Sequence, residues 1–554
     1  MRSVRDALRL LSLPLAFASA ALAAEPDAAV MQRGQSIFVE KCSMCHLMNG
    51  AGIPSVYPPL AQSDWLMADR ARAVRVLAQG LGEKITVNGI VYNNIMPAQI
   101  LDDAAVSDVL TYITNSWGNQ AAPFTAEEVR VARARTRFNT YEALVKASTY
   151  SPLPTPPAGL KVREVAQLPE LSTRIAKGRN SKDAFALAQN GGIYRIDLEH
   201  GGAVSRIIPA GDYLDSTKGK IQALGMTQDD ENRLLVVINQ RNDRTEPYVT
   251  NDVTIYRTTE MKDGVPATFK PWIVTTYPYG IGYYDHGVNK IAFGPDGMLY
   301  LASGSRTDGG EKGTNPRFSQ EGEVDLSAAI WRIDPKAENP KAVAIVHGLR
   351  NAFGFDWDNQ GRMFSVTNGP DANMPEEMDE IIPGRHYGFP YQYGDLPATA
   401  GSPYPHTPPA PAGLTFTHPV LNFGPAAGGS ADKPLSTFDP HSSPAGMIWC
   451  GDEFPEPLRN RFLVARYGNM LGGDYAPVDV GFDVVSVQLK KNEADGRWHA
   501  KTETILAPLG RPIDIIKLEG GRALILEYTR PTDYRSQLPQ MGGRIIEISA
   551  SDKP

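Results

Sequence analysis

The sequence predicts a multidomain protein, with an all-α domain over residues 25–120 followed by an all-β six-bladed propeller over residues 161–550. Three observations support this division. Apolar residues recur at helical spacing near the N-terminus, paired strand-like runs recur six times in the remainder, and a proline-rich stretch at 151–158 separates the two regions. A chain of 554 residues exceeds one ordinary domain, and its 51 glycines and 44 prolines suit many short strands joined by turns.

Residues 1–24 have the features of a signal peptide. A stretch with three arginines precedes an apolar core at 10–22, which ends in the cleavage-like motif Ala21-Leu22-Ala23. The alternative is a membrane anchor, which needs a longer apolar span. No later segment approaches 18 uninterrupted apolar residues. We therefore expect export to the periplasm and a mature chain without a transmembrane segment.

The first domain contains the motif Cys42-Ser43-Met44-Cys45-His46. Two thiols three positions apart can bond the two vinyl groups of one haem, and the adjacent imidazole can then bind the iron. The alternatives are a chance match or a redox CxxC pair, and the latter belongs near a βαβ pattern that this sequence lacks. We predict one covalent haem c held by Cys42 and Cys45, with His46 as an axial ligand. Export fits this prediction, since c-type haems are attached outside the cytoplasm. The third cysteine, Cys450, is expected to be a small buried apolar residue.

Apolar spacing predicts helices on both sides of this motif. Residues 31–38 form a short helix before it, residues 70–81 form a second, and a third begins at Asp102-Asp103. Three prolines between residues 54 and 59 force an extended loop after the motif. Residues 121–160 are a predicted linker, helix-prone at first, with a possible capping box at Thr125, and proline-rich and semi-rigid at 151–158.

This order of elements resembles a class I cytochrome c. The resemblance implies that Met96, which a proline follows on the loop before the last helix, is the second axial ligand. The alternative for Met96 is an ordinary core methionine. A thioether ligand stabilises ferrous iron and so favours an electron acceptor. The segment 88–94 resembles the same loop in the cytochrome subunits of alcohol dehydrogenases.

In the second domain, six strand-like runs are each followed by a partner run. The first runs are 184–188, 234–238, 298–302, 363–367, 462–465 and 523–527, and the partners are 193–197, 254–257, 330–334, 378–382, 484–488 and 544–548. Repeated short strands with tight turns predict a β-propeller, and six recurrences disfavour the alternative of a pair of β-sandwiches. Function in a propeller is expected near the central channel, where loops from every blade converge.

Several motifs in this domain resemble the quinoprotein glucose/sorbosone dehydrogenases, which use pyrroloquinoline quinone (PQQ). They are His286 with the following Phe-Gly-Pro-Asp-Gly, the pair Arg350-Asn351, and the series Asn-Gly-Pro, Asp-Glu and Tyr-Gly-Phe-Pro within residues 368–390. The resemblance implies that His286 is the general base that removes the hydroxyl proton of a sugar. An imidazole suits this task because its pKa lies near working pH. The alternative is a structural histidine.

The resemblance also implies which residues hold PQQ. Arg350 and Asn351 are the expected pair, with Arg511 and Arg466 as further cofactor arginines. Because a guanidinium can stabilise charge on a quinone during its reduction, Arg350 is also a candidate catalytic residue. A surface Arg-Asn turn is the alternative for this pair. Gln222 is the candidate for the glutamine of the family.

A calcium site is predicted from oxygen donors of the fourth blade. Backbone carbonyls of Gly369, Pro370 and Tyr387, with the carboxylates of Asp379 and Asp395, suit a hard cation that takes six to eight oxygen ligands. In the resembling family one Ca²⁺ lies beside PQQ and another has a structural role.

The sequence also departs from the glucose dehydrogenases. They carry Gly-Asp where this chain has Gly304-Ser305, and that aspartate supports the catalytic histidine. Asp285 and Asp308 are possible substitutes. Gly304-Ser305, the run 328–331 and His441 resemble the sorbosone and pyranose dehydrogenase branch instead.

Together these features predict a periplasmic quinohaemoprotein dehydrogenase. It would oxidise a sugar or a related hydroxy or aldehyde compound at PQQ and pass electrons to its tethered haem, with a respiratory cytochrome or oxidase as the next acceptor. The alternative is a cofactor-free propeller that binds a partner protein and presents it to the cytochrome. A cytochrome-fused nitrite reductase would need eight blades. The net charge of −7 argues against nucleic acid as a partner.

Overall fold

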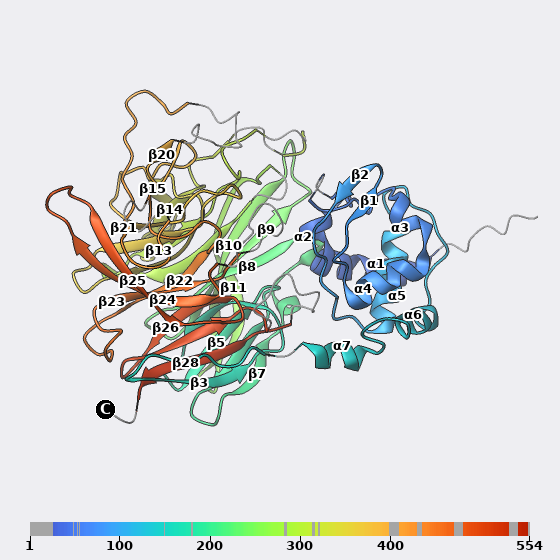
Figure 1. Cartoon of the computed structure of the whole chain (residues 1–554), viewed down its shortest axis with the longest axis horizontal. Coiled ribbons are helices and arrows are strands. Elements are labelled where there is room, and N and C mark those ends of the chain that lie inside the picture. The colour runs from blue at the N-terminus through green and yellow to red at the C-terminus, as the bar shows by residue number, and fades with distance from the viewer. Residues whose placement is uncertain are drawn as a thin grey trace, which may run out of the picture.

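The computed structural model describes residues 26–551, except for residues 48, 53, 55, 149, 179–180, 282–284, 313–315, 319–321, 398–408, 429–434, 470–479 and 531–540. It contains a helical domain beside a propeller of β-sheets (Figure 1). The predicted signal peptide lies outside the described residues. No helix in the described parts of the chain has the length and apolar character needed to cross a membrane.

The helical domain surrounds an apolar core. Its elements are α1 (Ala28–Ile37), a π-helical turn at Phe38–Cys42, α2 (Ser43–His46), α3 (Asp64–Ala68), α4 (Arg70–Gln79), the hairpin β1 (Ile85–Val87) and β2 (Ile90–Tyr92), and α5 (Asp103–Ile113). The three predicted helices are confirmed, and the hairpin was not predicted. The carboxylates of Asp27, Asp69 and Asp102 cap the amino ends of α1, α4 and α5.

Helices α1 and α5 cross at Gly34. A Cβ atom at this position would lie 2.2 Å from the carbonyl oxygen of Asp108, so only glycine lets the two backbones approach this closely. Arg33 and Asp108 form an ion pair at 2.6 Å beside the crossing. The crossing carries Phe38, fully buried at the end of α1, into the core against Val106 and Leu110 of α5.

The predicted linker contains two helices. Helix α6 (Ala126–Arg133) begins at Thr125, whose hydroxyl accepts a hydrogen bond from the backbone N–H of Glu128 at 3.1 Å. It packs on α4 and α5, and Glu128 pairs with Arg70 at 2.9 Å. Helix α7 (Tyr141–Ala147) follows, and the chain then runs to the first strand of the propeller.

Six sheets of the propeller repeat one arrangement. From the channel outwards, the first blade contains β4 (Ser172–Lys177), β5 (Asp183–Ala188), β6 (Ile193–Asp197) and β7 (Ala203–Ile208), and the second contains β8 (Ile221–Gln228), β9 (Leu234–Asn242), β10 (Thr250–Lys262) and β11 (Val265–Pro278). The third contains β12 (Val288–Phe293), β13 (Leu299–Ser303), β14 (Ala329–Ile333) and β15 (Val343–His347), and the fourth contains β16 (Ala352–Trp357), β17 (Met363–Thr367) and β18 (Glu377–Glu380). The fifth contains β22 (Pro444–Cys450), β23 (Arg461–Arg466), β24 (Asp483–Lys491), β25 (Trp498–Leu506) and β21 (Leu421–Asn422), and the sixth contains β26 (Pro512–Leu518), β27 (Arg522–Glu527), β28 (Arg544–Ala550) and β3 (Leu160–Gln167). A small hairpin, β19 (Gln392–Tyr393) and β20 (Leu396–Pro397), follows the fourth sheet.

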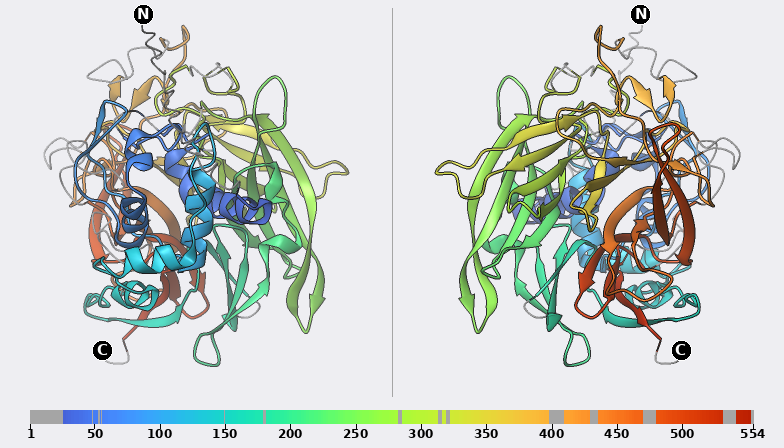
Figure 2. Two further views of the ribbon diagram at one scale, coloured as in Figure 1. Left: turned by 90° about the vertical axis from the view of Figure 1, so that its right-hand side faces the viewer. Right: turned by 90° about the vertical axis from the view of Figure 1, so that its left-hand side faces the viewer.

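The innermost strands close into a ring. Strands β4, β8, β12, β16, β22 and β26 each contact the next, and β26 contacts β4. Strand β3, from the start of the propeller, completes the sixth sheet beside β28 from its end, so the two ends of the domain are held together and the ring has no open edge. Figure 2 shows the sheets radiating around a common axis. The prediction of six blades is confirmed.

The predicted strand pairs correspond to the second and third strands of each blade. The inner strands were not recognised, because each departs from regular pairing near its start and three of them contain a glycine. At Gly354 of β16 a Cβ would lie 2.0 Å from the carbonyl oxygen of Ala445 of β22. Cys450 is buried and is a free cysteine, as predicted.

Replacing Gly34 by alanine should destabilise the helical domain by about 2 kcal/mol, because the added methyl group overpacks the crossing of α1 and α5. Denaturant unfolding of the full chain, followed through the helical signal, measures this loss. Gly211→Ala is the matched control, since no atom lies within 4 Å of a Cβ built there. Equal stability of both variants would contradict the described crossing.

Candidate functional site on one face of the propeller

The residues that precede the inner strands meet at one end of the channel. Arg350 and Asn351 lie directly before β16, Arg511 lies directly before β26, and His286 and His441 lie shortly before β12 and β22. Because the inner strands run in the same direction around the ring, these residues share one face. The structure therefore brings together predicted residues from four blades.

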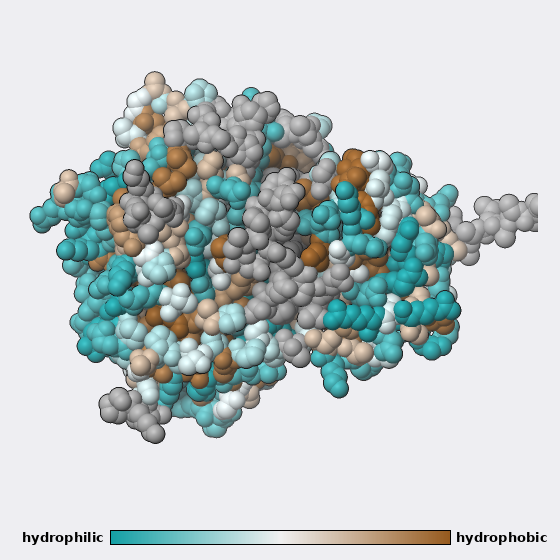
Figure 3. All heavy atoms as spheres, in the orientation of Figure 1, coloured by the Kyte–Doolittle hydropathy of each residue, from teal (hydrophilic) through white to brown (hydrophobic). Residues whose placement is uncertain are grey.

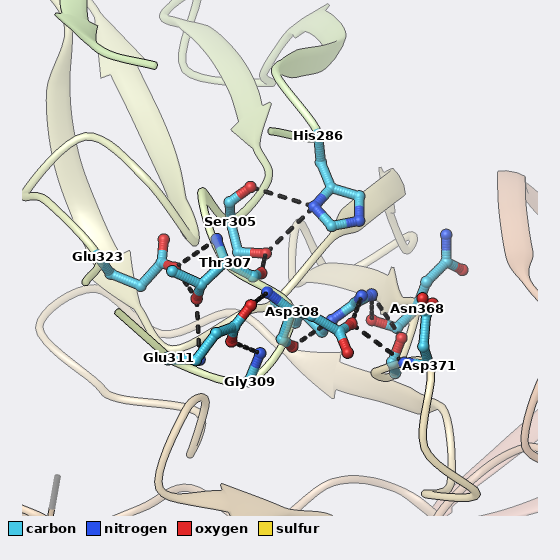
Figure 4. Close-up of polar contacts among 12 residues, drawn as sticks. His286, Ser305, Thr307, Asp308, Gly309, Glu311, Glu323, Asn368 and Asp371 are labelled. Carbon is cyan, nitrogen blue, oxygen red and sulfur yellow. Dashed lines mark hydrogen bonds and ion pairs between the residues drawn. The ribbon is translucent and has the colours of Figure 1, made fainter. Parts of the chain in front are cut away.

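His286 lies against Ser305 (Figure 4). The backbone N–H of His286 donates to the carbonyl oxygen of Ser305 at 3.1 Å. The ring nitrogen Nδ1 lies 3.1 Å from the same carbonyl oxygen and 3.2 Å from the Ser305 hydroxyl. Burial, and then the positive charge of Arg350, lower the pKa of His286 to about 3. The imidazole is therefore neutral at working pH, with a lone pair available for a proton.

Neither aspartate expected to support His286 contacts its ring. The carboxylate of Asp285 accepts hydrogen bonds from the backbone N–H groups of Gly280 and Gly287, at 2.8 and 2.9 Å. Asp308 pairs with Arg350. The expectation that one of them substitutes for the missing aspartate is wrong, because their oxygens are directed elsewhere. Ser305, which the sequence interpretation treated as a loss, occupies that place.

Arg350 is buried and held by the protein itself. Its guanidinium donates to the carboxylate and carbonyl oxygens of Asp308 and to the carbonyl oxygens of Asn368 and Gly369. The carboxylate of Asp308 also accepts from the backbone N–H of Asp371 at 3.1 Å. Burial raises the pKa of Asp308 to about 7, against the opposing effect of Arg350. Arg350 is thus fixed in orientation beside His286.

Asn351 presents a side-chain amide to the same face. Its Oδ1 accepts a hydrogen bond from the buried Asn289 at 3.0 Å. Gly304 lies between His286 and Asn351, and a Cβ there would lie 2.4 Å from the Cβ of His286. Only glycine at this position therefore lets His286 pack this closely against the backbone.

The other two predicted cofactor arginines are buried in different surroundings. Arg466 forms a two-pronged ion pair with Asp483, at 2.8 and 2.6 Å. Arg511 is fully buried between the rings of Tyr467 and Phe482, with its charge centre 4.8 and 4.7 Å from their centroids. The backbone of Arg511 has a φ of 59°, the left-handed region that non-glycine residues rarely adopt.

His441 belongs to the same cluster. Its Nε2 lies 2.8 Å from Oδ1 of Asn373. Burial lowers the pKa of His441, the negative charge of Asp371 raises it, and the positive charge of Arg350 lowers it further. The side chain of Gln222, on β8, makes no hydrogen bond among the described residues, and its backbone oxygen accepts one from the side chain of Asn239 at 3.4 Å. The role of Gln222 stays a prediction.

The five predicted calcium ligands do not form one set. In the sheet Asp379 pairs with Ser365, and Ser365 lies four residues before Gly369. The backbones of Asp379 and Gly369 are therefore on the order of 10 Å apart. Ligands of one Ca²⁺ lie much closer, since each is about 2.4 Å from the ion. The prediction of a single site from all five residues is wrong, because Gly369 and Pro370 lie beside Arg350 and Asp379 lies deeper in the blade.

Asp379 itself has an unusual environment. It is 1% exposed, and neither carboxylate oxygen has a hydrogen-bond partner among the residues that the structure describes. Burial, and then the neighbouring carboxylate of Glu377, raise its pKa well above the usual range. Asp395 is paired with Arg497 at 2.6 Å and with His418 at 2.8 Å. Within the described residues, no group of three or more His, Cys, Asp or Glu side chains is arranged to hold a metal ion.

Tyr387 is tied to β18. Its hydroxyl donates to the carbonyl oxygen of Glu380 at 2.7 Å and accepts from the backbone N–H of Ile382 at 2.8 Å. These bonds hold the loop after β18 close to the strand. They leave only the backbone carbonyl of Tyr387 for the ligand role that the sequence predicts.

The helical domain contains a second site, an apolar cavity that is partly open to solvent. Its lining includes Cys42, His46 and Met96. Nδ1 of His46 lies 2.9 Å from the carbonyl oxygen of Pro58, which accepts the Nδ1 proton. Met96 pairs with Leu81 through two backbone hydrogen bonds of 2.8 Å. Burial lowers the pKa of His46, so its imidazole is neutral and can act as a ligand.

The CxxCH motif lies close to the propeller site across the domain boundary. Lys220, directly before β8, interacts electrostatically with Cys45 of α2 and with Asp285, the neighbour of His286. Figure 1 shows α2 next to the sheet that contains β8 and β9. The helix with the CxxCH motif therefore lies on the propeller face that carries His286 and Arg350.

Known families match both parts of the chain. Residues 31–117 match the cytochrome c model, and residues 226–469 match the glucose / sorbosone dehydrogenase model. Cytochrome c-552 of Thermus thermophilus is 38% identical over 112 residues, which cover 18% of this chain and 85% of that protein. The cytochrome c subunit of the alcohol dehydrogenase (quinone) of Gluconacetobacter polyoxogenes is 30% identical over 105 residues, covering 18% of this chain and 22% of that protein.

Solved structures also resemble the propeller. The PQQ-bound aldose sugar dehydrogenase of Streptomyces coelicolor is 18% identical, covers 72% of this chain and 100% of its own, and has a TM-score of 0.46. The holo PQQ domain of pyranose dehydrogenase from Coprinopsis cinerea is 13% identical, covers 72% of this chain and 97% of its own, and also has a TM-score of 0.46. Through its N-terminal domain the chain belongs to the cytochrome c family, and this domain is fused to a six-bladed propeller in which residues 226–469 match the glucose / sorbosone dehydrogenase model.

Proposed function

We propose that this protein is an exported dehydrogenase that oxidises a sugar, or a related hydroxy or aldehyde compound, at PQQ in its propeller. The electrons then pass to haem c in its cytochrome domain. The two family matches support an oxidoreductase with a built-in electron acceptor. The observation that carries the proposal is that α2, which contains Cys45, lies on the same propeller face as His286 and Arg350.

Lys220 connects the two sites. Burial, and then the charge of Arg241, lower the pKa of Lys220 to about 8, so its amine is mainly protonated at neutral pH. Lys220 lies near enough to Cys45 and Asp285 for both to raise its pKa, so the haem motif is close to the neighbour of the candidate base. An acceptor tethered on this face has a far higher effective concentration than one that diffuses.

The cavity of the cytochrome domain fits a haem. Cys42 and Cys45 would carry the two thioether bonds, and His46 and Met96 would be the axial ligands. Because Nδ1 of His46 is bonded to Pro58, Nε2 is the nitrogen left for the iron. The mainly apolar lining would surround the haem with few polar groups. When bound, haem c takes up one electron at a time, and a methionine ligand favours its ferrous form.

The propeller face fits an anionic quinone through Arg350 and Asn351. Oδ1 of Asn351 is engaged by Asn289, so its amide NH₂ would be the group that donates to the quinone. Arg511 and Arg466 would provide further positive charge. When bound, PQQ supplies a quinone that accepts hydride from a hydroxyl-bearing carbon.

His286 would accept the hydroxyl proton of the substrate. Its neutral ring lies in a partly buried position where a proton acceptor is not saturated by water. Arg350, fixed by Asp308, lies alongside with a positive charge that would stabilise an oxyanion. The two residues thus supply a base and an electrostatic stabiliser from neighbouring blades.

Calcium would bind at Asp379. Two buried carboxylate oxygens that have no hydrogen-bond partner among the described residues, next to Glu377, are the kind of donors that a hard cation takes. The carbonyl oxygen of Gly369 accepts a hydrogen bond from Arg350, so Gly369 would not belong to this set of ligands.

An external electron acceptor would approach the cytochrome domain at β2. Ile90 and Val91 of this strand are 39% and 44% exposed, whereas Ile85 and Val87 of β1 line the cavity. Figure 3 shows apolar surface where Figure 1 labels β2. A respiratory cytochrome or oxidase is the proposed partner, and export to the periplasm would bring the protein to it.

A test of the proposal starts from full-length, haem-loaded protein supplied with PQQ and Ca²⁺. Addition of aldoses and ketoaldehydes from a panel should reduce the haem, visible as growth of its α band, because the bound quinone and the haem share one chain. Omission of PQQ is the control and should leave the haem oxidised. If PQQ does not bind, or no substrate of the panel reduces the haem in its presence, the proposal is contradicted.

A second candidate function is a cofactor-free module that binds a partner protein. The observation that favours it is that Arg350 and Arg466 are each neutralised by an aspartate of the protein, Asp308 and Asp483. Such a module would be purified without PQQ and would not bind added PQQ. The PQQ content of the isolated protein separates the two functions.

Replacing Lys220 by methionine should lower the haem midpoint potential by on the order of tens of millivolts, because a nearby cation favours the less positive, reduced haem. Spectroelectrochemical titration of the full chain measures this potential. Lys218→Met is the matched control, since Lys218 is exposed and lies two residues away. An unchanged potential in the Lys220 variant would show that its charge does not act on the haem.

Replacing Asp379 by asparagine should raise the melting temperature of the protein in the presence of a chelator, because the variant removes a buried carboxylate that has no partner among the described residues. Calcium should stabilise the wild type and leave the variant unchanged. Thermal unfolding with and without Ca²⁺ measures both effects. Glu493→Gln, at an exposed position, is the control. The same calcium-dependent shift in the wild type and the Asp379 variant would exclude this residue as a ligand.

A further inference from the structure

The ring of His286 has its Nδ1 nitrogen against two oxygens of Ser305 (Figure 4). One is a carbonyl oxygen, which can only accept a hydrogen bond. The other is the Ser305 hydroxyl, which donates its own proton to the carbonyl oxygen of Thr307 at 2.7 Å. Towards Nδ1 this hydroxyl can therefore also only accept. Both neighbours require a proton on Nδ1, which leaves the lone pair on Nε2.

We propose that Ser305 is a positioning residue that keeps Nε2 of His286 as the basic nitrogen, and that Thr307 and Glu323 hold Ser305 in place for this task. The inference rests on the proposed role of His286 as a base and deepens it. It assigns to a serine, and mainly to its backbone carbonyl, the orienting role that a carboxylate has in other base–orienter pairs.

Glu323 anchors the loop that contains Ser305. Its carboxylate accepts hydrogen bonds from the backbone N–H groups of Arg306 and Thr307, at 2.9 and 3.0 Å, and from the Thr307 hydroxyl at 2.5 Å. A fourth hydrogen bond comes from the Ser327 hydroxyl at 2.7 Å. Ser305, Arg306 and Thr307 are fully buried. The loop is therefore held at the two residues that directly follow Ser305.

The other end of the loop is fixed as well. The backbone N–H of Ser305 donates to the carbonyl oxygen of Arg350 at 2.6 Å, which joins the loop to the next blade. The Thr307 hydroxyl also accepts from the backbone N–H of Gly310 at 2.9 Å. Since both sides are tied, rotation of the Ser305 carbonyl away from His286 would break several buried hydrogen bonds.

Because Ser305 is neutral, it orients His286 without stabilising the protonated ring. A carboxylate partner fixes the tautomer of a histidine and also stabilises its protonated form, whereas the oxygens of Ser305 fix only the tautomer. The charged group that acts on the ring is Arg350, which opposes protonation. The adjacent Asp285 is bonded to backbone amides, and Asp308 is bonded to Arg350. His286 is therefore a neutral base over the physiological pH range.

The tautomer can be measured without substrate or cofactor. Full-length protein with ¹⁵N-labelled histidine gives the ring nitrogen shifts, and His286→Gln assigns them. The wild type should show a protonated Nδ1 and an unprotonated Nε2, with no titration between about pH 5 and pH 8. Thr307→Val, which removes the hydroxyl bonded to Glu323 with little change of shape, should give a mixture of the two tautomers.

Ser327→Ala is the matched control, because it also removes one hydrogen bond to Glu323 but leaves the bonds of Thr307 intact. Its histidine spectrum should equal that of the wild type. Ser305→Asp should raise the pKa of His286 into the measured range, because it places a carboxylate at the oriented nitrogen. A wild-type ring protonated on Nε2, or one that titrates near its ordinary pKa, would overturn the inference. The predicted tautomer combined with no haem reduction by any substrate would support the inference and contradict the proposed function.

Discussion

Closure of the ring of inner strands is the constraint on which the rest of the structure depends. Strand β3 joins the sixth blade beside β28, so the first and last parts of the propeller hold each other. Within the closed ring every inner strand runs in the same direction, which places the residues before each strand on one face. His286 and Arg350 are 64 positions apart by number and meet only because of this geometry. A strand lost from the ring would separate the residues of the site.

Buried ion pairs give this face its rigidity. Arg350 with Asp308 and Arg466 with Asp483 are each removed from water, which costs several kcal/mol per ion before their attraction is counted. Such pairs contribute little net stability, but each fixes a long side chain in one orientation. The face is thus preorganised. Aspartates of the protein itself, rather than a ligand, balance the charges of Arg350 and Arg466. Asp379 is the contrasting case, a buried carboxylate whose oxygens have no hydrogen-bond partner within the described structure.

Much of the fold could be predicted, because the second strand of each blade is a largely apolar run and a mixed run of the type Ile-Tyr-Arg-Ile-Asp follows it. The inner strands escaped prediction, since irregular pairing and glycines such as Gly354 interrupt their pattern. The helices around the CxxCH motif were predictable from apolar spacing. The hairpin of β1 and β2 was not, because its strands have three residues each.

The site was predictable in its residue types more than in its contacts. His286 and Arg350 stand in recognisable motifs, and the structure brings them together. The role of Ser305 was missed, because it depends on a backbone carbonyl that no side-chain pattern reveals. Glu323 was also missed, since it lies in an irregular insertion 18 positions after Ser305. The sequence interpretation placed the calcium ligands in one site, because the sequence does not show that Asp379 pairs with Ser365, several residues away from Gly369.

The central claim is that one chain both oxidises its substrate and receives the electrons. Its most direct test is the rate of haem reduction after rapid mixing of the PQQ-loaded protein with substrate, measured at several protein concentrations. Transfer between the domains of one molecule predicts a rate constant that does not change with protein concentration. A rate that rises in proportion to protein concentration would show transfer between separate molecules and would contradict the account.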